Sequence, residues 1–390
     1  MFLENPVIHI LFLVMCLFSS VTHAEVENNR CQNRHCVAIV DAGSTGSRLH
    51  IYAYDLDSQE RPIAIEQLWS KKVKPGLASI EPNQAAIDAY MNNLFDQAPE
   101  QNIPLYLYAT AGMRLLSESK QHVYYNLLNH WVETQTQWTL MDVKTISGSQ
   151  EGVFGWLAVN YKLGALQSAN QPLAAVMDMG GASVQVSIPV EHSDLIDAHN
   201  RVEVNAYDKH VTLFVHSFLG LGQTELSHQY LNDKYCFPVG YPLPDDASGE
   251  GQASICQQDI SRLINLVHHV DNIVKPVVAN NPATPWYAIS GVSMLVQSQP
   301  FYFKNDQFTS QDILNQADQG LCQQSWQTLN ARFFGNDSTY MSCLSASYYY
   351  ALMVNGYGLQ PTQAIHYMAS QDEPDWTLGV VIEQSSKLLK

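Results

Sequence analysis

The chain has 390 residues, more than the roughly 250–300 at which a single hydrophobic core stops growing, so we expect two domains. Hydrophobic residues make up 46% and charged residues 15%, which is typical of a packed globular protein and excludes a disordered one. The net charge of −17 excludes a nucleic-acid-binding protein, because such binding depends on Lys and Arg that neutralise phosphates. A small phosphorylated ligand is compatible with this charge if backbone amides and a metal ion supply the positive field.

The first 24 residues have the pattern of a cleaved signal peptide. An apolar run from Ile8 to Phe18 precedes small residues that end at Ala24, a suitable signal-peptidase site. The alternative is a membrane anchor, but the run is shorter than the ~20 residues that a spanning helix needs. We therefore expect a secreted or periplasmic monomer with no membrane segment after cleavage.

The cysteine count agrees with an oxidising compartment, because six of the seven cysteines follow the predicted signal peptide. A zinc site is the alternative, but no CxxC or HxxxH spacing supports it. Several pairings are formally open. Proximity in the sequence favours three disulfides, Cys31 with Cys36, Cys236 with Cys256, and Cys322 with Cys343.

A predicted strand from Cys36 to Val40 runs into a turn of small residues, 41–46. Apolar and polar side chains then alternate from Leu49 to Tyr54, which predicts a second strand. The small side chains let the backbone approach a ligand, and successive N–H groups can form a nest for phosphate oxygens. Alone, the turn is weak evidence, since glycine-rich hairpins are ordinary β-turns.

An alternating strand from Leu105 to Ala109 leads into a loop and then a helical stretch from Leu115. Thr110 can donate a hydroxyl hydrogen bond, and Arg114 can offer its guanidinium fork to a phosphate oxygen. The alternative is a helix-entry turn with a surface arginine.

Ser147 and Gln150 have the spacing of a capping box, which places Glu151 in the first turns of a helix. Gly152 and Gly155 lie inside this helix, where glycine costs about 1 kcal/mol relative to alanine, so we expect a ligand or another loop to approach closely. A glutamate here complements the helix dipole in any case. Beside a bound phosphate it could also orient and deprotonate water.

The strand-turn-strand pattern returns at 173–188, where a second turn of small residues follows another acidic residue. The two acidic residues, Asp41 and Asp178, each end the first strand of their unit. Duplication of a whole α/β domain would place the two loops face to face across an interdomain cleft, where ligand sites commonly lie. We therefore predict that both loops hold one phosphate chain.

Five segments, in this order, resemble the apyrase conserved regions of the nucleoside triphosphate diphosphohydrolase (ecto-apyrase) family. They are DAGSTGSR at 41–48, ATAGMR at 109–114, the GSQEG, GW and Asn pattern at 148–160, DMGGASVQV at 178–186 and DWTLG at 375–379. The chain is similar to soluble, exported, bacterial-type members, although Val184 stands where the family usually has Thr. The resemblance implies the α/β fold of the actin, Hsp70 and sugar-kinase superfamily, with duplicated RNase H-like domains and an interdomain cleft.

The duplication then divides the chain into domain I, residues 36–160 with about 370–390, and domain II, residues 161–369. The resemblance also implies roles for single residues: Glu151 is the general base, and Ser183 and Gln185 position the attacking water. Asp41 and Asp178 would face a divalent cation, Mg²⁺ or Ca²⁺, through its waters. The residues implied to hold phosphate oxygens are Ser44, Thr45, Gly46, Arg48, Thr110, Arg114, Gly181 and Ala182.

Tyr350 belongs to a run of three tyrosines that could stack on a nucleobase, since aromatic faces accept any base. A tyrosine-rich core strand or helix explains the run equally well. Trp156 and Trp376 match family tryptophans, but a buried tryptophan is more often part of a core.

The function that these residues imply is an apyrase, which removes terminal phosphates from nucleoside tri- and diphosphates and converts ATP to ADP and then to AMP. An exopolyphosphatase or guanosine pentaphosphate phosphatase shares the DxGGxS loop, but the GSQEG segment and the six cysteines favour the apyrase. A non-catalytic nucleotide-binding module needs neither Glu151 nor Gln185. A sugar kinase rests on the fold alone and would meet little ATP outside a cell.

Overall fold

The computed structural model describes residues 31–99, 102–134, 138–191, 196–230, 232–334, 336 and 338–386. The predicted signal peptide lies outside these residues. Among them, no helix has the length and hydropathy needed to cross a membrane. The chain forms two compact units: unit 1 is Met1–Ala42, Gly46–Ala109 and Ser117–Lys144, and unit 2 is Gly43–Thr45, Thr110–Leu116 and Thr145–Lys390.

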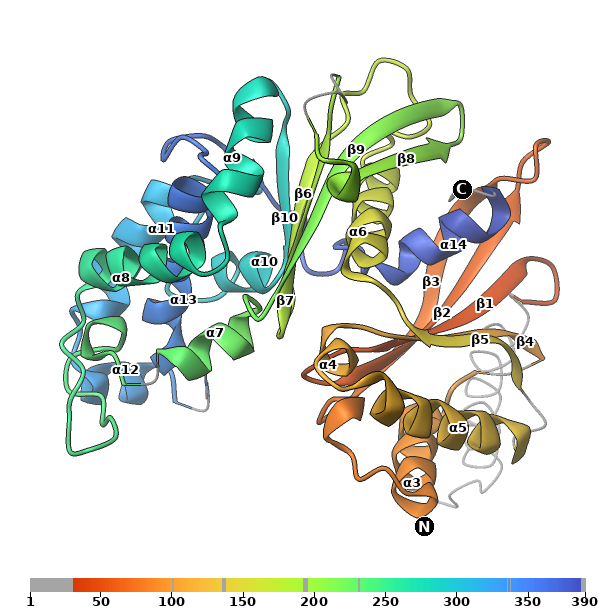
Figure 1. Cartoon of the computed structure of the whole chain (residues 1–390), viewed down its shortest axis with the longest axis horizontal. Helices are drawn as coiled ribbons and strands as arrows, with labels where there is room; N and C mark the ends of the chain where they lie inside the picture. The colour runs from red at the N-terminus through yellow and green to blue at the C-terminus, as the bar shows by residue number, and fades with distance from the viewer. Residues whose placement is uncertain are drawn as a thin grey trace, which may run out of the picture. The chain divides into compact units, whose positions relative to one another are not determined.

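The described strands of unit 1 form one five-stranded sheet in the order β3-β2-β1-β4-β5. β2 runs antiparallel to β1 and β3, and β4 runs parallel to β1. Helices α3 and α5 pack against each other (Figure 1). The bounds are β1 His35–Ala42, β2 Ser47–Leu56, β3 Pro62–Val73, η1 Leu77–Ser79, α3 Gln84–Phe95, β4 Ile103–Ala109, α5 Glu118–Thr134 and β5 Trp138–Thr145.

The described strands of unit 2 form one seven-stranded sheet in the order β11-β12-β10-β6-β7-β9-β8. β7 runs antiparallel to β6 and β9, and β10 runs parallel to β6. The bounds are β6 Ala175–Met179, β7 Ser183–Pro189, β8 Arg201–Ala206, β9 Lys209–Leu219, β10 Trp286–Ser290, β11 Gln307–Phe308 and β12 Ile365–His366.

Helices cover both faces of this second sheet. In Figure 1, α6 and α14 lie on one side and α8, α11 and α13 lie on the other. The longer helices are α6 Gly148–Lys162, α8 Ala253–Leu266, α9 Val270–Asn280, α11 Ser310–Ala317, α13 Ser342–Tyr350 and α14 Thr377–Ser386. The shorter ones are α4 Ala111–Arg114, α7 Gln223–Gln229, α10 Gly291–Val296, α12 Trp326–Arg332, η3 Ala198–Asn200, η4 Lys234–Cys236, η5 Asp318–Cys322, η6 Thr339–Met341 and η7 Ala351–Gly356.

The two sheets share a topology. In both, the first strand turns back into an antiparallel second strand, a third strand pairs antiparallel with the second, and a later strand runs parallel beside the first. The register also repeats, because Asp41 pairs with Arg48 across one hairpin and Asp178 pairs with Gln185 across the other. This repetition confirms the predicted α/β fold of duplicated RNase H-like units.

Contacts group two helices differently from the domain limits given by the sequence. α6 and α14 pack against each other and belong to unit 2, whereas the sequence assigned both to domain I. The crossing is close, since a Cβ added to Gly379 would lie 2.2 Å from the carbonyl oxygen of Phe154. The sequence limits follow the duplicated segments rather than the contacts, so they stay a prediction.

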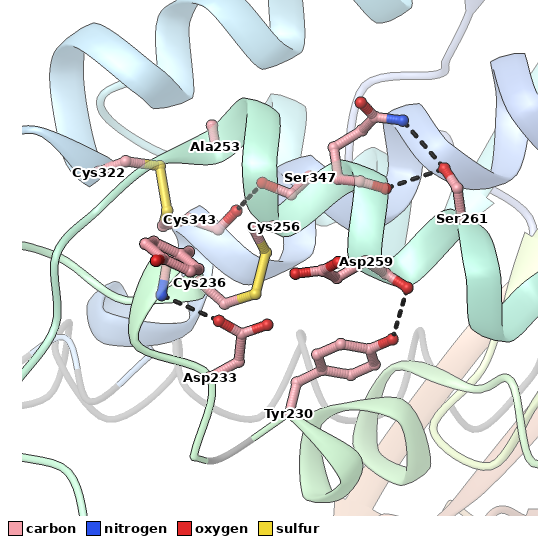
Figure 2. The surroundings of a disulfide bond; sticks show 12 residues. Tyr230, Asp233, Cys236, Ala253, Cys256, Asp259, Ser261, Cys322, Cys343 and Ser347 are labelled. Atoms are coloured by element: carbon pink, nitrogen blue, oxygen red, sulfur yellow. Dashed lines mark hydrogen bonds between the residues drawn. A yellow bond between two sulfur atoms is a disulfide. The ribbon is translucent and has the colours of Figure 1, made fainter. Parts of the chain in front are cut away.

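Disulfides join the helical layer of unit 2 (Figure 2). Cys236 bonds to Cys256 on α8, and Cys322 bonds to Cys343 on α13. With the Cys31–Cys36 bond in unit 1, all three pairs that proximity favoured are present among the described residues. Such bonds are typical of proteins that fold outside the cytosol.

Candidate active site

Three predicted loops meet within unit 2. A Cβ added to Gly181 would lie 2.6 Å from both Oγ of Ser44 and Cγ2 of Thr45. A Cβ added to Gly112, in the loop that carries Thr110, would lie 2.8 Å from Cα of Ser44. The glycines are therefore needed because backbone and short side chains pack directly against them.

The turn between β6 and β7 is held through its carbonyl groups. The first N–H groups of α7 donate to Gly180 O at 2.9 Å and to Gly181 O at 2.8 Å. The Gly220 N–H donates to Ala182 O at 2.8 Å. All these carbonyls therefore point toward α7 and the end of β9.

The N–H groups of Gly181 and Ala182 have no acceptor among the described residues. Backbone N–H groups are strong donors that seek a partner, and adjacent ones form anion-binding nests. Because the neighbouring carbonyls are already bonded, this turn offers donors to a ligand. That arrangement suits phosphate oxygens.

Glu151 lies in the first turn of α6, where the predicted capping box is present: Gln150 N–H donates to Ser147 Oγ at 3.0 Å, and Ser147 N–H donates to Gln150 Oε1 at 3.1 Å. Its side chain is buried, with Glu151 7% exposed. The cap fixes the start of the helix and thereby the direction of the Glu151 side chain.

Arg114 and Gln185 hold the same oxygen of Glu151. Arg114 Nη2 lies 2.7 Å and Gln185 Nε2 lies 3.0 Å from Oε2 of Glu151. The same two groups also donate to Ser183 Oγ, at 3.0 Å and 2.7 Å. Oε1 of Glu151 has no hydrogen-bond partner in the described chain, so this oxygen is available to a water molecule.

Burial raises the pKa of Glu151, because the charged carboxylate loses hydration. The Arg114 guanidinium opposes this rise in pKa through its charge and hydrogen bond, and the Asp375 carboxylate adds to it. Glu151 is therefore a stronger base than an exposed glutamate, while Arg114 keeps its ionised form accessible.

Asp178, near the end of β6, is also buried. Burial raises its pKa to about 7; a hydrogen bond from Ser290 opposes the rise, and the charges of Glu151, Asp375 and Glu373 add to it. Hard divalent cations prefer such oxygen donors. Among the described residues, no group of three or more His, Cys, Asp or Glu side chains is arranged to hold a metal ion, so the cation role of Asp178 stays a prediction.

Three other predicted residues, Asp41, Gly46 and Arg48, belong to unit 1. Asp41 is the last residue but one of β1 and pairs in register with Arg48 on β2. Their roles toward the metal and the phosphates stay predictions.

The glycines of α6 are explained by the sheet beneath the helix. A Cβ added to Gly152 would lie 2.8 Å from Cγ1 of Val215 on β9, and one added to Gly155 would lie 3.6 Å from Oδ2 of Asp178. The predicted close approach is therefore confirmed at Gly152, where a strand side chain makes it, whereas the separation at Gly155 is ordinary van der Waals contact.

Ser217 was not predicted as a site residue. Gln185 Nε2 donates to its Oγ at 3.0 Å, and a Cβ added to Gly148 would lie 2.3 Å from the same oxygen. The sequence carried a weak signal, since Ser217 lies on the alternating strand that leads into the glycine-rich 219–222 segment. Neither feature indicated which residue it contacts.

The three tyrosines of the run 348–350 differ in burial. Tyr348 and Tyr349 are fully buried, and Tyr349 Oη donates to Gln223 Oε1 at 2.9 Å, which fits the core interpretation. Tyr350 is partly exposed, so base stacking stays a prediction for it. Both tryptophans are also core residues: Trp156 donates to Ala174 O at 2.8 Å, and Trp376 stacks on the Phe154 ring.

The fold of two related α/β units and the geometry of this site fit a phosphohydrolase. The GDA1/CD39 (nucleoside phosphatase) family matches residues 27–236 and 244–389. The chain therefore belongs to this family.

Relatives and solved structures agree. The nucleoside-diphosphatase mig-23 of Caenorhabditis briggsae is 27% identical, over 95% of this chain and 81% of that protein. The crystal structure of nucleoside triphosphate hydrolases from Neospora caninum covers 95% of this chain and 96% of that chain, with a TM-score of 0.64 and 14% identity. A member of the Ppx/GppA family from Aquifex aeolicus covers 90% and 98%, with a TM-score of 0.56 and 14% identity.

These findings confirm the predicted class of enzyme, a nucleoside phosphohydrolase. Dependence on a divalent cation is general in the family. At 14% identity, the two structural similarities bear on the fold alone.

Proposed function

We propose that the protein hydrolyses the terminal phosphate of nucleoside triphosphates and diphosphates in succession, from ATP to ADP to AMP, with Glu151 as the general base. One observation carries this proposal. Oε2 of Glu151 is held by Arg114 and Gln185, while Oε1 has no partner in the described chain. A carboxylate that is oriented through one oxygen and open at the other suits the activation of water.

The phosphate would be held mainly by backbone N–H and hydroxyl donors, together with arginine side chains. The N–H groups of Gly181 and Ala182 would bind its oxygens, helped by Ser44 and Thr45, which pack against Gly181. Thr110 and Arg114 would bind from the next loop, and the sequence resemblance alone assigns Gly46 and Arg48 to phosphate binding. This grip explains how a chain of net charge −17 binds a polyanion.

The water is positioned beside Glu151. The Gln185 amide donates to Ser183 Oγ at 2.7 Å, next to Glu151. A water held beside this pair and Oε1 of Glu151 would face the terminal phosphorus in line with the leaving oxygen. As the water attacks, its proton passes to Oε1 of Glu151. The bond to the leaving phosphate oxygen breaks, which releases inorganic phosphate and the shortened nucleotide.

A divalent cation, Mg²⁺ or Ca²⁺, neutralises charge on the phosphate oxygens when bound. Asp178 would hold it through water molecules, and the sequence resemblance alone assigns the same role to Asp41. The buried position of Asp178, with carboxylates nearby and a raised pKa, supports this assignment. Removal of the cation by EDTA should abolish activity.

The place of action follows from the disulfides. Two of them cross-link the helical layer of unit 2, and such bonds persist in oxidising compartments. Together with the signal-peptide pattern of residues 1–24, they support an exported protein, secreted or periplasmic, that acts on extracellular or periplasmic nucleotides.

The test is release of inorganic phosphate by the mature protein from ATP, ADP, AMP, GTP, UTP and polyphosphate, with Mg²⁺ or Ca²⁺. We expect release from tri- and diphosphates, none from AMP, and none in EDTA. Faster release from polyphosphate than from ATP would instead favour an exopolyphosphatase.

A further inference from the structure

Ser290 adopts a backbone conformation that side-chain-bearing residues avoid. It is the last residue of β10 and precedes α10, with φ of 60° and ψ of −123°. A non-glycine residue in such a region costs on the order of 1–3 kcal/mol and persists only where its surroundings enforce it. Something must therefore hold this turn.

Glu373 is the group that holds it. Its Oε1 accepts from the N–H of Ser290 at 2.5 Å, and its Oε2 accepts from the hydroxyl of Ser293. Ser293 is completely buried, and its Oγ also accepts from Gln297 Nε2 at 2.7 Å. Both carboxylate oxygens are thus engaged by one turn, although Glu373 lies about 80 residues further along the chain.

The same turn delivers a hydroxyl to the site. β10 runs parallel to β6, with Ile289 beside Asp178 and Ser290 beside Met179. The Ser290 side chain is also the hydrogen-bond partner that lowers the pKa of the buried Asp178 carboxylate. The conformation of Ser290 therefore decides whether Asp178 has this donor.

We propose that Glu373 is a positioning residue of the active site: it fixes the Ser290 turn, so that the Ser290 hydroxyl orients the Asp178 carboxylate toward the cation-bound phosphate. The structural part of the proposal stands on contacts alone. Its catalytic part rests on the proposed function, because it needs phosphate hydrolysis to be observed.

The structural arm uses metal-free protein and amide hydrogen exchange. Glu373→Ala should raise exchange of the Ser290 to Ser293 amides about tenfold or more, because Ser290 loses the acceptor of its N–H. Glu373→Gln retains an acceptor at Oε1 and should stay within about threefold of the wild type. Asp372→Ala is the matched control, since it removes an exposed neighbouring carboxylate and should change nothing. Unchanged exchange in Glu373→Ala would show that Glu373 does not hold the Ser290 turn.

The kinetic arm asks whether Glu373 acts through Ser290. Glu373→Ala and Ser290→Ala should each lower kcat for ATP about tenfold with little change in KM, and the double variant should be no slower than the slower single variant. Glu373→Asp keeps the negative charge, but its shorter side chain does not reach the turn. Its kcat should therefore resemble that of Glu373→Ala, and it replaces that variant in the test if the alanine variant does not fold.

The catalytic part would be overturned if the two single-variant losses in kcat multiplied in the double variant. A wild-type kcat in Glu373→Ala would also overturn it. If the wild type hydrolyses no nucleotide, the proposed function fails, while the exchange experiment still decides whether Glu373 holds the turn. The two failures are therefore distinguishable.

Discussion

Nη2 of Arg114 lies 2.7 Å from Oε2 of Glu151, and both side chains are largely buried. Burial raises the pKa of Glu151, and the guanidinium opposes that rise. In the proposed mechanism activity requires the ionised base, so it should fall as the pH drops through the pKa of Glu151. The pairing should therefore set the lower limit of the pH range in which the enzyme works.

The first prediction concerns that limit. Arg114→Gln removes the cation, so the pKa of Glu151 should rise further and the acidic limb of kcat/KM should move to higher pH. The pH profile of ATP hydrolysis measures this shift. Arg114→Lys keeps a positive charge and should move the limb less. An unshifted limb in Arg114→Gln would show that the ion pair does not control the base.

The second prediction concerns the turn that offers N–H donors to phosphate. A Cβ added to Gly222, just before α7, would lie 2.3 Å from Ala182 N and from Gly181 C. Gly222→Ala should displace the turn and lower kcat/KM for ATP on the order of 100-fold. In the control Gly320→Ala, the added Cβ would meet Pro300 Cγ at 3.4 Å, so activity should be kept. Wild-type kinetics in Gly222→Ala would contradict the role of this turn.

Much of this site was predictable because its residues sit at the ends of strands and the start of a helix. The capping box places Glu151 at the start of a helix, and small residues mark the turn after Asp178, whereas the role of Glu151 comes from the resemblance to the apyrase regions. Duplication of the pattern indicates that they serve one ligand. The α/β fold class follows from the same repetition.

The residues that were missed act across the chain. Ser217 is linked to the site by its contact with Gln185, and Glu373 by its contact with Ser290. The spacing of residues along the sequence does not reveal such tertiary contacts. The glycines of α6 were noticed for their helix cost, but the sequence does not show that Val215 packs there. The assignment of α6 to unit 2 likewise depends on tertiary packing, which the sequence pattern does not show.

The third prediction concerns Ser217, whose Oγ accepts from the Gln185 amide. Ser217→Ala should lower kcat about threefold to tenfold, because the amide loses one of the partners that orient it. Ser187→Ala is the matched control: this buried serine donates to Gly152 O at 2.9 Å, and no hydrogen bond joins it to Gln185 among the described residues. It should cost about 1 kcal/mol of stability and leave kcat unchanged. Equal kcat in the two variants would argue against a role for Ser217.

The fourth prediction concerns the disulfides. Cys236 and Cys256 are 20 residues apart, so replacing both with serine should lower the free energy of unfolding by roughly 3 kcal/mol. Cys31 and Cys36 are 5 residues apart, and their replacement should cost roughly 2 kcal/mol. Urea unfolding measures both. A larger loss from the shorter loop would contradict the expected dependence on loop length.

The most direct test of the central claim is the turnover of Glu151→Gln with ATP and Mg²⁺, measured as phosphate release. The amide keeps the shape of the side chain and an acceptor for Arg114 and Gln185, but it takes no proton from water. We expect kcat to fall by roughly 10²–10⁴-fold, the loss typical of a missing general base. Turnover close to that of the wild type would show that Glu151 is not the base.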